Sequence, residues 1–295
     1  MTHFSVKATQ QKHLMSELTD AFENASIETA ALDARLLLQH VTGLSHSDFI
    51  LQQELELTSS QLSQLSALAR RRLHREPISR IIGHSEFWSL PFLISKDTLD
   101  PRPDTETLIE HALELIGARK NEPLRLLDLG TGSGCILLSL LHEIPFATGL
   151  GVDINPGAIE IAQKNAQKLS LETRAKFQKS DWFSTLEGKF DVILSNPPYI
   201  PESELENLMP EVKNFDPDLA LNGGETGLQP YELIFKEALQ FLTSEGFLLL
   251  EFGQNQETQL IEILNESNLK PFLDCYTFKK DLAGIIRTFG AQFSF

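Results

Sequence analysis

Two hydrophobic periodicities divide the chain. As far as about residue 76, apolar side chains recur at helical spacing with polar residues between them. They predict one helix over 28–41, ended by Gly43, and a second from Ser59 or Ser60 to Leu73. From residue 124 onward, short apolar runs alternate with amphipathic stretches, which is typical of strands alternating with helices.

The second pattern predicts an α/β protein with a doubly wound sheet of seven strands. The expected helices include 134–143, 156–169 and 229–242. The expected strands are 124–129, 148–153, 174–179, 190–195, 246–252, 271–277 and 284–290.

Between the two patterns, Pro77 breaks the helical spacing. Residues 80–93 are rich in β-forming residues around Gly83 and predict a hairpin. We therefore expect a small all-helical domain over 1–76, a β-hairpin linker over 77–95 and an α/β domain over 96–295. Within the last, Asp104 or Thr105 is expected to cap a helix that runs to about Gly117.

Charge argues against nucleic acid as the main partner. The net charge is −16, whereas proteins that grip nucleic acid usually carry a basic domain. Residues 1–76 hold seven basic and nine acidic side chains, so −14 of the charge lies beyond them. The cluster from Arg70 to Arg75 is interpreted as a solvated helix end, with contact to an acidic partner or RNA as the alternative.

Cysteine and histidine give no sign of a metal site. Cys135 and Cys275 lie far apart and form no metal-ligand spacing with the eight histidines. The start of the chain has no apolar signal region, and no apolar run approaches membrane-spanning length. We expect a cytoplasmic protein that binds neither metal nor membrane.

A glycine-rich turn follows the first expected strand of the α/β part. The strand runs into Gly130-x-Gly132-x-Gly134 and then a helix, so the backbone can approach a ligand closely. Asp153 ends the next strand, nineteen residues after Gly134, where a carboxylate can accept bonds from ribose hydroxyls. The alternative is a tight turn with an acidic helix cap.

This arrangement resembles the class I S-adenosylmethionine-dependent methyltransferases. The resemblance implies that the first-strand Asp128 and the loop backbone meet the methionyl end of the cofactor, and that Asp153 holds the ribose. It places adenine beside Asp181 and Trp182, although Trp182 taken alone is more often a core residue. The implied loop residues are Gly130, Thr131, Gly132, Ser133 and Gly134.

The strand over 190–195 stops abruptly at Asn196-Pro197-Pro198-Tyr199. A planar ligand NH₂ group can donate one hydrogen to the Asn196 side-chain oxygen and the other to the Pro197 carbonyl, with the Tyr199 ring against its face. A proline-rich turn with a capping Asn is the alternative. Beside the cofactor loop, the motif predicts methyl transfer to a planar nitrogen, and we expect no general base to be needed before attack.

Four segments together resemble the bacterial peptide chain release factor glutamine methyltransferase family (PrmC/HemK). They are Glu76-Pro77 with Gly83–Trp88, Pro101–Glu106, Leu127–Cys135 and Ser195–Ile200. Single motifs such as Asn-Pro-Pro-Tyr are shared with DNA amino-methyltransferases, whereas the combination is specific. Phe252 and the lead-in over 99–101 depart slightly from the family pattern.

The resemblance implies S-adenosylmethionine as cofactor and, as substrate, the glutamine of the Gly-Gly-Gln loop of class I release factors. Asn196, Pro197, Pro198 and Tyr199 would hold that glutamine, and the helical domain would help hold the release factor. Residues 102–106 would lie near the methionyl end of the cofactor, with helix capping by Thr105 and Glu106 as the alternative. The loop over 217–228 would flank the site.

Three other functions are compatible with parts of the sequence. Methylation of a ribosomal-protein glutamine would use the same motif chemistry. Methylation of a nucleic-acid amino group would need a basic face that the charge does not indicate. A non-catalytic binding module would bind the cofactor without methylating any acceptor.

Overall fold

The structure, a computed structural model, describes residues 4–52 and 54–295. The chain divides into two compact units. The first comprises the described residues up to Gly83 together with 209–215, and the second comprises 84–208 and 216–295. The first unit therefore takes in a short segment from far along the chain.

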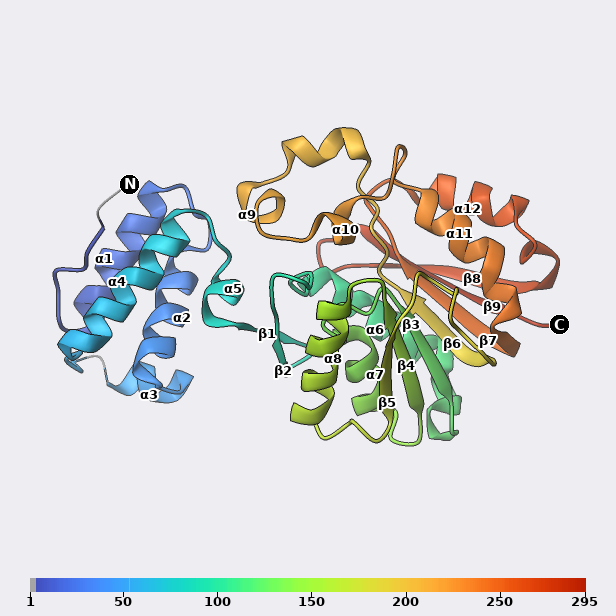
Figure 1. Cartoon of the computed structure of the whole chain (residues 1–295), viewed down its shortest axis with the longest axis horizontal. Helices are drawn as coiled ribbons and strands as arrows, with labels where there is room; N and C mark the ends of the chain where they lie inside the picture. The colour runs from blue at the N-terminus through green and yellow to red at the C-terminus, as the bar shows by residue number, and fades with distance from the viewer. Residues whose placement is uncertain (1–3, 53) are drawn as a thin grey trace. The chain divides into compact units, whose positions relative to one another are not determined.

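The first unit is helical (Figure 1). The predicted helix over 28–41 and the predicted helix ending at Leu73 are both present, and Gly43 ends the former with a left-handed φ of 72°. The helix ending at Leu73 begins with a capping box between Thr58 and Gln61. The helices of the unit are α1 (Gln11–Asn24), α2 (Ala30–Thr42), α3 (His46–Leu51), α4 (Ser59–Leu73), α5 (Ile78–Ile82) and α9 (Pro210–Lys213).

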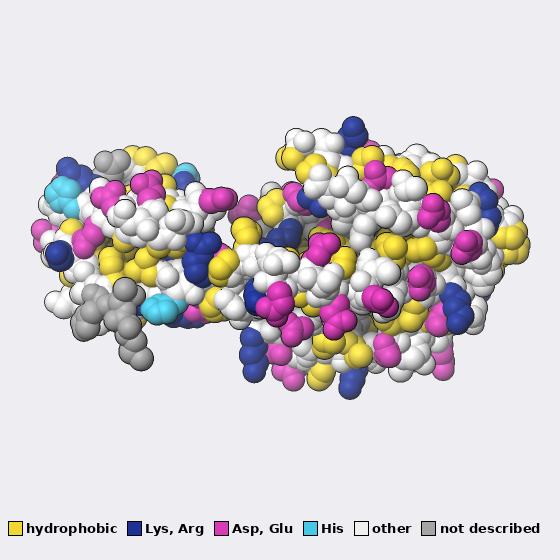
Figure 2. Space-filling view, turned by 90° about the horizontal axis from the view of Figure 1, so that it is seen from above, with side chains coloured by type: hydrophobic (Ala, Val, Ile, Leu, Met, Phe, Trp, Pro, Cys, Tyr) yellow, Lys and Arg dark blue, Asp and Glu magenta, His cyan; other side chains and the backbone are white. Residues whose placement is uncertain are grey.

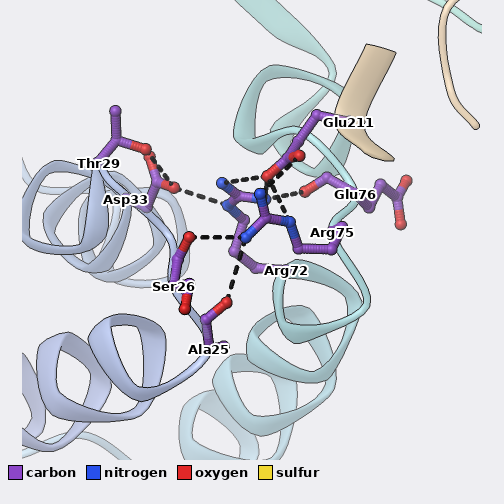
Figure 3. A network of polar contacts seen from close by, with 8 residues as sticks. All are labelled: Ala25, Ser26, Thr29, Asp33, Arg72, Arg75, Glu76 and Glu211. Carbon is purple, nitrogen blue, oxygen red and sulfur yellow. Dashed lines mark hydrogen bonds and ion pairs between the residues drawn. The ribbon is translucent and has the colours of Figure 1, made fainter. Parts of the chain in front are cut away.

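The basic cluster at the end of α4 is not simply a solvated helix end, so that interpretation was wrong for Arg72. Its guanidinium is buried, donates from Nε to Asp33 at 2.7 Å and donates to Glu211 of α9 at 3.2 Å (Figure 3). Arg75 also pairs with Glu211 and donates to the carbonyl of Ser26. The cluster therefore fastens α9 within the first unit.

The predicted hairpin is shorter than expected. Residues 78–82 form α5, which ends at Gly83 with a φ of 81°, and the two strands are β1 (His84–Phe87) and β2 (Leu90–Leu93). Their turn places Trp88 and Ser89 at positive φ. Glu106 offsets this unfavourable turn by accepting a 2.7 Å bond from the Trp88 backbone N–H.

The second unit contains the predicted seven-stranded sheet, in the order β5-β4-β3-β6-β7-β9-β8. The pairs β7–β9 and β8–β9 are antiparallel, and the remaining pairs are parallel. The strands are β3 (Arg125–Leu129), β4 (Thr148–Asp153), β5 (Ala175–Lys179), β6 (Phe190–Ser195), β7 (Leu242–Glu251), β8 (Leu273–Lys280) and β9 (Ile286–Phe293).

Helices cover both faces of this sheet, as a doubly wound fold requires (Figure 1). Along β6, Val192 and Leu194 belong to one hydrophobic core, whereas Ile193 belongs to the other. The first core includes residues of α6 (Glu106–Ile116), α7 (Cys135–Glu143) and α8 (Pro156–Lys168). The second includes residues of α11 (Gln229–Glu237) and α12 (Glu257–Glu266).

Short helical turns fill the connections of the second unit. They are η1 (Pro103–Thr105), η2 (Gly117–Asn121), η3 (Glu202–Asn207), α10 (Asp218–Leu221), η4 (Ala238–Gln240) and η5 (Lys270–Phe272). Figure 2 shows acidic side chains spread over the visible face of this unit. Among the described helices, none is long and apolar enough to cross a membrane.

Candidate active site

A pocket of about 550 Å³ opens where β3, β4, β5 and β6 end in the second unit, a size typical of small-molecule sites. Its wall includes nine of the residues singled out from the sequence, namely Gly130, Thr131, Gly132, Ser133, Asp153, Asp181, Trp182, Asn196 and Pro198. Four others are not part of the wall, namely Asp128, Gly134, Pro197 and Tyr199. Most of the predicted residues therefore meet in one place.

The glycine loop presents bare backbone to the pocket. Gly130, Gly132 and Gly134 have φ values of 70°, 54° and 81°, which glycine adopts at little cost. A Cβ built on Gly130 or Gly132 would meet no atom within 4 Å, so a ligand can lie directly against the chain there. Helix α7 starts immediately afterwards, at Cys135, and its first N–H groups favour a negatively polarised ligand group.

Asp153 ends β4, and its carboxylate bonds to the backbone of the glycine loop. Its two carboxylate oxygens accept the backbone N–H groups of Gly132 at 2.9 Å and Asn155 at 2.8 Å. Burial raises the pKa of Asp153, and these backbone bonds oppose that rise. Each oxygen keeps a further lone pair, so this carboxylate can also accept from ligand hydroxyls.

Asp128 lies beneath the loop and is completely buried. One oxygen accepts from the Thr131 hydroxyl at 2.6 Å, whereas the other, Oδ1, has no hydrogen-bond partner among the described residues. Burial raises the pKa of Asp128 to about 7. A buried acceptor without a partner is costly, and an incoming donor or cationic ligand group would relieve that cost.

Trp182 also lies in the pocket wall, and its backbone conformation is uncommon. Its φ of 48° lies in the left-handed region, and its carbonyl accepts a 2.8 Å bond from the Ser180 hydroxyl. Asp181 beside it is exposed to solvent. The strain at Trp182 therefore coincides with a pocket wall that has an aromatic side chain next to a carboxylate.

Asn196 is fixed at the end of β6 by groups from distant parts of the chain. Its Nδ2 donates to the Thr105 hydroxyl oxygen at 3.2 Å. The preceding Ser195 donates to the Leu129 carbonyl of β3 at 2.8 Å, which ties the motif strand to the cofactor-loop strand. Glu251, the last residue of β7, accepts hydrogen bonds from the side chains of Thr105 and Asn196.

Glu251 belongs to the site although no sequence motif singled it out. Burial raises the pKa of Glu251 to about 7, even though the bond from Thr105 and the charge of Arg287 lower it. A carboxylate that follows the apolar run of β7 is a signal that could have found it, because charged residues are rarely fully buried without a role.

The expected helix cap at Asp104 or Thr105 is absent. Thr105 itself has helical φ and ψ angles and makes no side-chain cap bond to α6, because its hydroxyl lies against Glu251 and Asn196 instead. Glu106, the first residue of α6, holds the β1–β2 turn. This segment therefore supports the site and the hairpin rather than capping its helix.

Tyr199 is held through its backbone. Its carbonyl accepts from Gln256 Nε2 at 3.1 Å, and the same side chain accepts from the Gly253 N–H at 2.9 Å. Burial, followed by the charge of Glu251, raises the pKa of the Tyr199 phenol to about 12, so the ring stays neutral. Six residues of the predicted flanking loop over 217–228 contribute to the pocket wall, namely Pro217, Leu219, Ala220, Asn222, Gly223 and Gly224.

In the described part of the chain, no cluster of His, Cys, Asp and Glu side chains could hold a metal ion. The pocket instead offers open glycine backbone, carboxylates and an aromatic wall. This set fits a ligand that carries hydroxyls, a flat ring and a cationic group, as S-adenosylmethionine does.

Comparisons with known proteins agree with this chemistry. Residues 13–83 match a family model described as the PrmC N-terminal domain, and residues 120–283 match one described as a methyltransferase domain. The chain is 46% identical over 260 residues to the release factor glutamine methyltransferase of Rhodospirillum rubrum, covering 88% of this chain and 78% of that protein. It is 43% identical to the same-named protein of Bradyrhizobium diazoefficiens, covering 93% and 92%.

Solved structures show the same fold. The hMettl16 catalytic domain, crystallised with the MAT2A 3′UTR hairpin 6, matches with a TM-score of 0.58 and 18% identity. The match covers 81% of this chain and 82% of that one. At this identity the likeness supports the class I methyltransferase fold and nothing further about the ligand or substrate.

Proposed function

The chain belongs to the release factor glutamine methyltransferase family, and we propose that it methylates the side-chain amide nitrogen of the glutamine in the Gly-Gly-Gln loop of class I peptide chain release factors. S-adenosylmethionine is the proposed methyl donor. The observation that carries the proposal is the Asn196 carboxamide, held by Thr105 and Glu251 in the wall of the glycine-loop pocket.

An amide nitrogen is a poor nucleophile, because its lone pair is delocalised into the carbonyl. Asn196 Oδ1 accepts one of its hydrogens and the Pro197 carbonyl accepts the other, with the Tyr199 ring against the amide plane. These contacts raise the electron density on nitrogen and fix its direction of approach. No general base is needed before attack in this scheme, and the proton leaves afterwards.

When bound, S-adenosylmethionine supplies an electrophilic sulfonium methyl. Asp153 is proposed to accept from its ribose hydroxyls, and Asp181 with Trp182 to contact its adenine. Asp128 and the loop over 130–134 are proposed to meet its methionyl end. The unobstructed glycine backbone supports this assignment for the loop.

The first unit is proposed to hold the release factor. Its match to the PrmC N-terminal domain model supports a role shared across the family. The acidic balance of the chain supports a protein substrate over nucleic acid.

The test is intact-mass analysis of a purified class I release factor after incubation with this protein and S-adenosylmethionine. We expect one added methyl group, and none on a release factor whose Gly-Gly-Gln glutamine is replaced by alanine. Two control incubations contain heat-denatured enzyme or omit the cofactor.

A release factor of unchanged mass, with cofactor binding confirmed by calorimetry, would contradict the proposed substrate. A ribosomal-protein glutamine or a nucleic-acid amino group would then be the acceptor to test, with the same mass readout. Cofactor binding without methylation of any of these would favour a binding module.

A further inference from the structure

Three side chains from separate parts of the chain meet at the pocket wall. Asn196 follows β6, Thr105 belongs to η1 and Glu251 ends β7. Thr105 and Glu251 are buried, with exposures of 3% and 2%, and Asn196 is half-buried. Thr105 and Asn196 both line the pocket. The Asn196 Nδ2 donates to Thr105 Oγ1 at 3.2 Å, and Glu251 accepts from both side chains.

The direction of these bonds follows from the donors available. An ionised carboxylate only accepts, so both bonds to Glu251 must come from N–H or O–H groups. Thr105 has a single hydroxyl hydrogen, and it donates that hydrogen to Glu251. Its oxygen is then left to accept, and the Asn196 carboxamide must turn its NH₂ end toward Thr105 and Glu251.

The other end of the same carboxamide is Oδ1, the atom that the proposed reaction requires to accept a hydrogen from the substrate amide. A carboxamide has nearly the same shape in both orientations, so packing alone does not select one. We propose that Glu251 is a positioning residue that, through the Thr105 hydroxyl, fixes the acceptor end of Asn196 toward the substrate amide. This inference rests on the proposed function and adds to it a residue that does not itself touch the substrate.

Protonation of Glu251 would remove its control over the orientation of the Asn196 carboxamide. A neutral carboxyl carries a hydrogen that it can donate to Asn196 Oδ1, which lets the carboxamide reverse and present NH₂ to the NH₂ of the substrate. Because two donors repel, the reversed form does not hold the substrate amide. Burial raises the pKa of Glu251 to about 7, so the change falls in an accessible pH range.

Charged and titratable groups surround Glu251 from every element packed against it. Arg287 of β9 favours its ionised form, and Asp104 of η1 opposes it. Tyr199, Tyr231 and Cys135 also lie within electrostatic reach, and all three have raised pKa values, so they stay neutral near pH 7. Arg287 is itself paired with Asp104 at 3.1 Å and with Asp281 at 3.0 Å, so its charge is shared among these carboxyls.

The decisive variant is Thr105→Val, which keeps the shape of the side chain and removes the hydroxyl. At saturating cofactor and release factor, we expect kcat to fall roughly 10–100-fold, the scale for losing a partner that orients a functional group. Thr105→Ser restores a hydroxyl and should recover kcat to within about threefold of wild type, on the order of 1 kcal/mol or less.

The matched control is Thr288→Val. Thr288 is also fully buried, and its hydroxyl bonds the His111 ring at 2.8 Å. This variant removes a buried hydroxyl from the residue that faces Glu251 across the β7–β9 pair. Among the described residues no hydrogen bond joins Thr288 to Asn196, so kcat should stay near wild type. Equal losses of kcat in Thr105→Val and Thr288→Val would overturn the inference, because both would then reflect general destabilisation.

The pH profile of kcat supplies a readout that a purely structural role would not change. The wild-type kcat should fall as pH drops through about 7, and this acid limb should be absent in Glu251→Gln, which has no proton to gain. A Glu251→Gln variant that retains the wild-type acid limb overturns the inference while wild-type methylation of the release factor stands. A wild-type protein that never methylates the release factor overturns the proposed function and this inference with it.

Discussion

Arg72 of the first unit and Glu251 of the second are both almost fully buried charges, but their surroundings differ. All three nitrogens of Arg72 donate, to Asp33, to the Glu76 carbonyl and to Glu211 (Figure 3). Glu251 keeps Oε2 without a hydrogen-bond partner among the described residues. Opposite charges compensate Arg72, whereas Glu251 is tolerated at a cost.

This difference separates a structural network from a functional one. A fully partnered buried charge fastens elements together, here α2, α4 and α9. A buried carboxyl with an open oxygen and a raised pKa is the pattern associated with active sites, where stability is lost in exchange for chemistry. Removing the Arg72 charge should therefore destabilise the fold, whereas removing the Glu251 charge should stabilise it and slow catalysis.

The largest effect is expected in the first unit. Arg72→Met leaves the buried Asp33 without its cation and removes one of the two arginines that pair with Glu211, so it should lower the free energy of unfolding by about 3–5 kcal/mol. Arg71→Met is the matched control on the same helix. Its side chain is 44% exposed and pairs with Glu76, so the loss should be about 1 kcal/mol or less. Urea unfolding measures both, and equal losses would contradict a special role for Arg72.

The same network should weaken in acid. Burial of Glu211 favours its neutral form, but hydrogen bonds from its backbone and from Arg75 and Arg72 outweigh this and lower its pKa. A lowered folded-state pKa means that Glu211 contributes stability above pH 4.5, which is lost as pH falls through the lower folded value.

The next effect concerns catalysis without a change in stability. Asn196→Ala should lower kcat roughly 10²–10³-fold, the scale for losing one positioned polar contact, equivalent to about 3–4 kcal/mol of barrier. Asn196 lies in the loop after β6, at the pocket wall, so the midpoint of unfolding should stay close to that of the wild type. Steady-state kinetics at saturating cofactor measure the change, and a loss below tenfold would contradict the assigned contact.

The smallest effect is a stabilisation. A carboxyl whose folded-state pKa exceeds its unfolded value binds its proton more tightly when folded. Glu251 therefore supports stability below pH 4.5, and that support is lost as pH rises to about 7. Glu251→Gln should raise the free energy of unfolding at pH 8 by roughly 1–3 kcal/mol, while catalysis becomes slower.

The matched control is Glu266→Gln, at the exposed end of α12. It removes one negative charge without removing a buried one, so it should not change the pH dependence of stability. Thermal unfolding followed from pH 4.5 to 8 compares both variants with wild type. A Glu251→Gln variant no more stable than wild type at pH 8 would show that Glu251 is not a destabilising buried charge.

Local sequence alone determined much of this protein. The alternation of apolar runs predicted all seven strands, because strand periodicity is written within a few residues. The glycine spacing predicted a turn into a helix with backbone open to a ligand, and the structure has Gly130, Gly132 and Gly134 there at left-handed φ values that disfavour other residues. Asn196 was found because two prolines cannot continue a strand.

Tertiary structure decided what surrounds these motifs. Thr105 lies 91 residues before Asn196, and Glu251 lies 55 residues after it, yet the sheet order brings both to its side chain. Arg72 pairs with Glu211 because the segment over 209–215 belongs to the first unit. A pattern of apolar and polar residues predicts a strand or helix within a short segment. Contacts between residues far apart in the sequence depend on which strands and helices pack together in the folded chain.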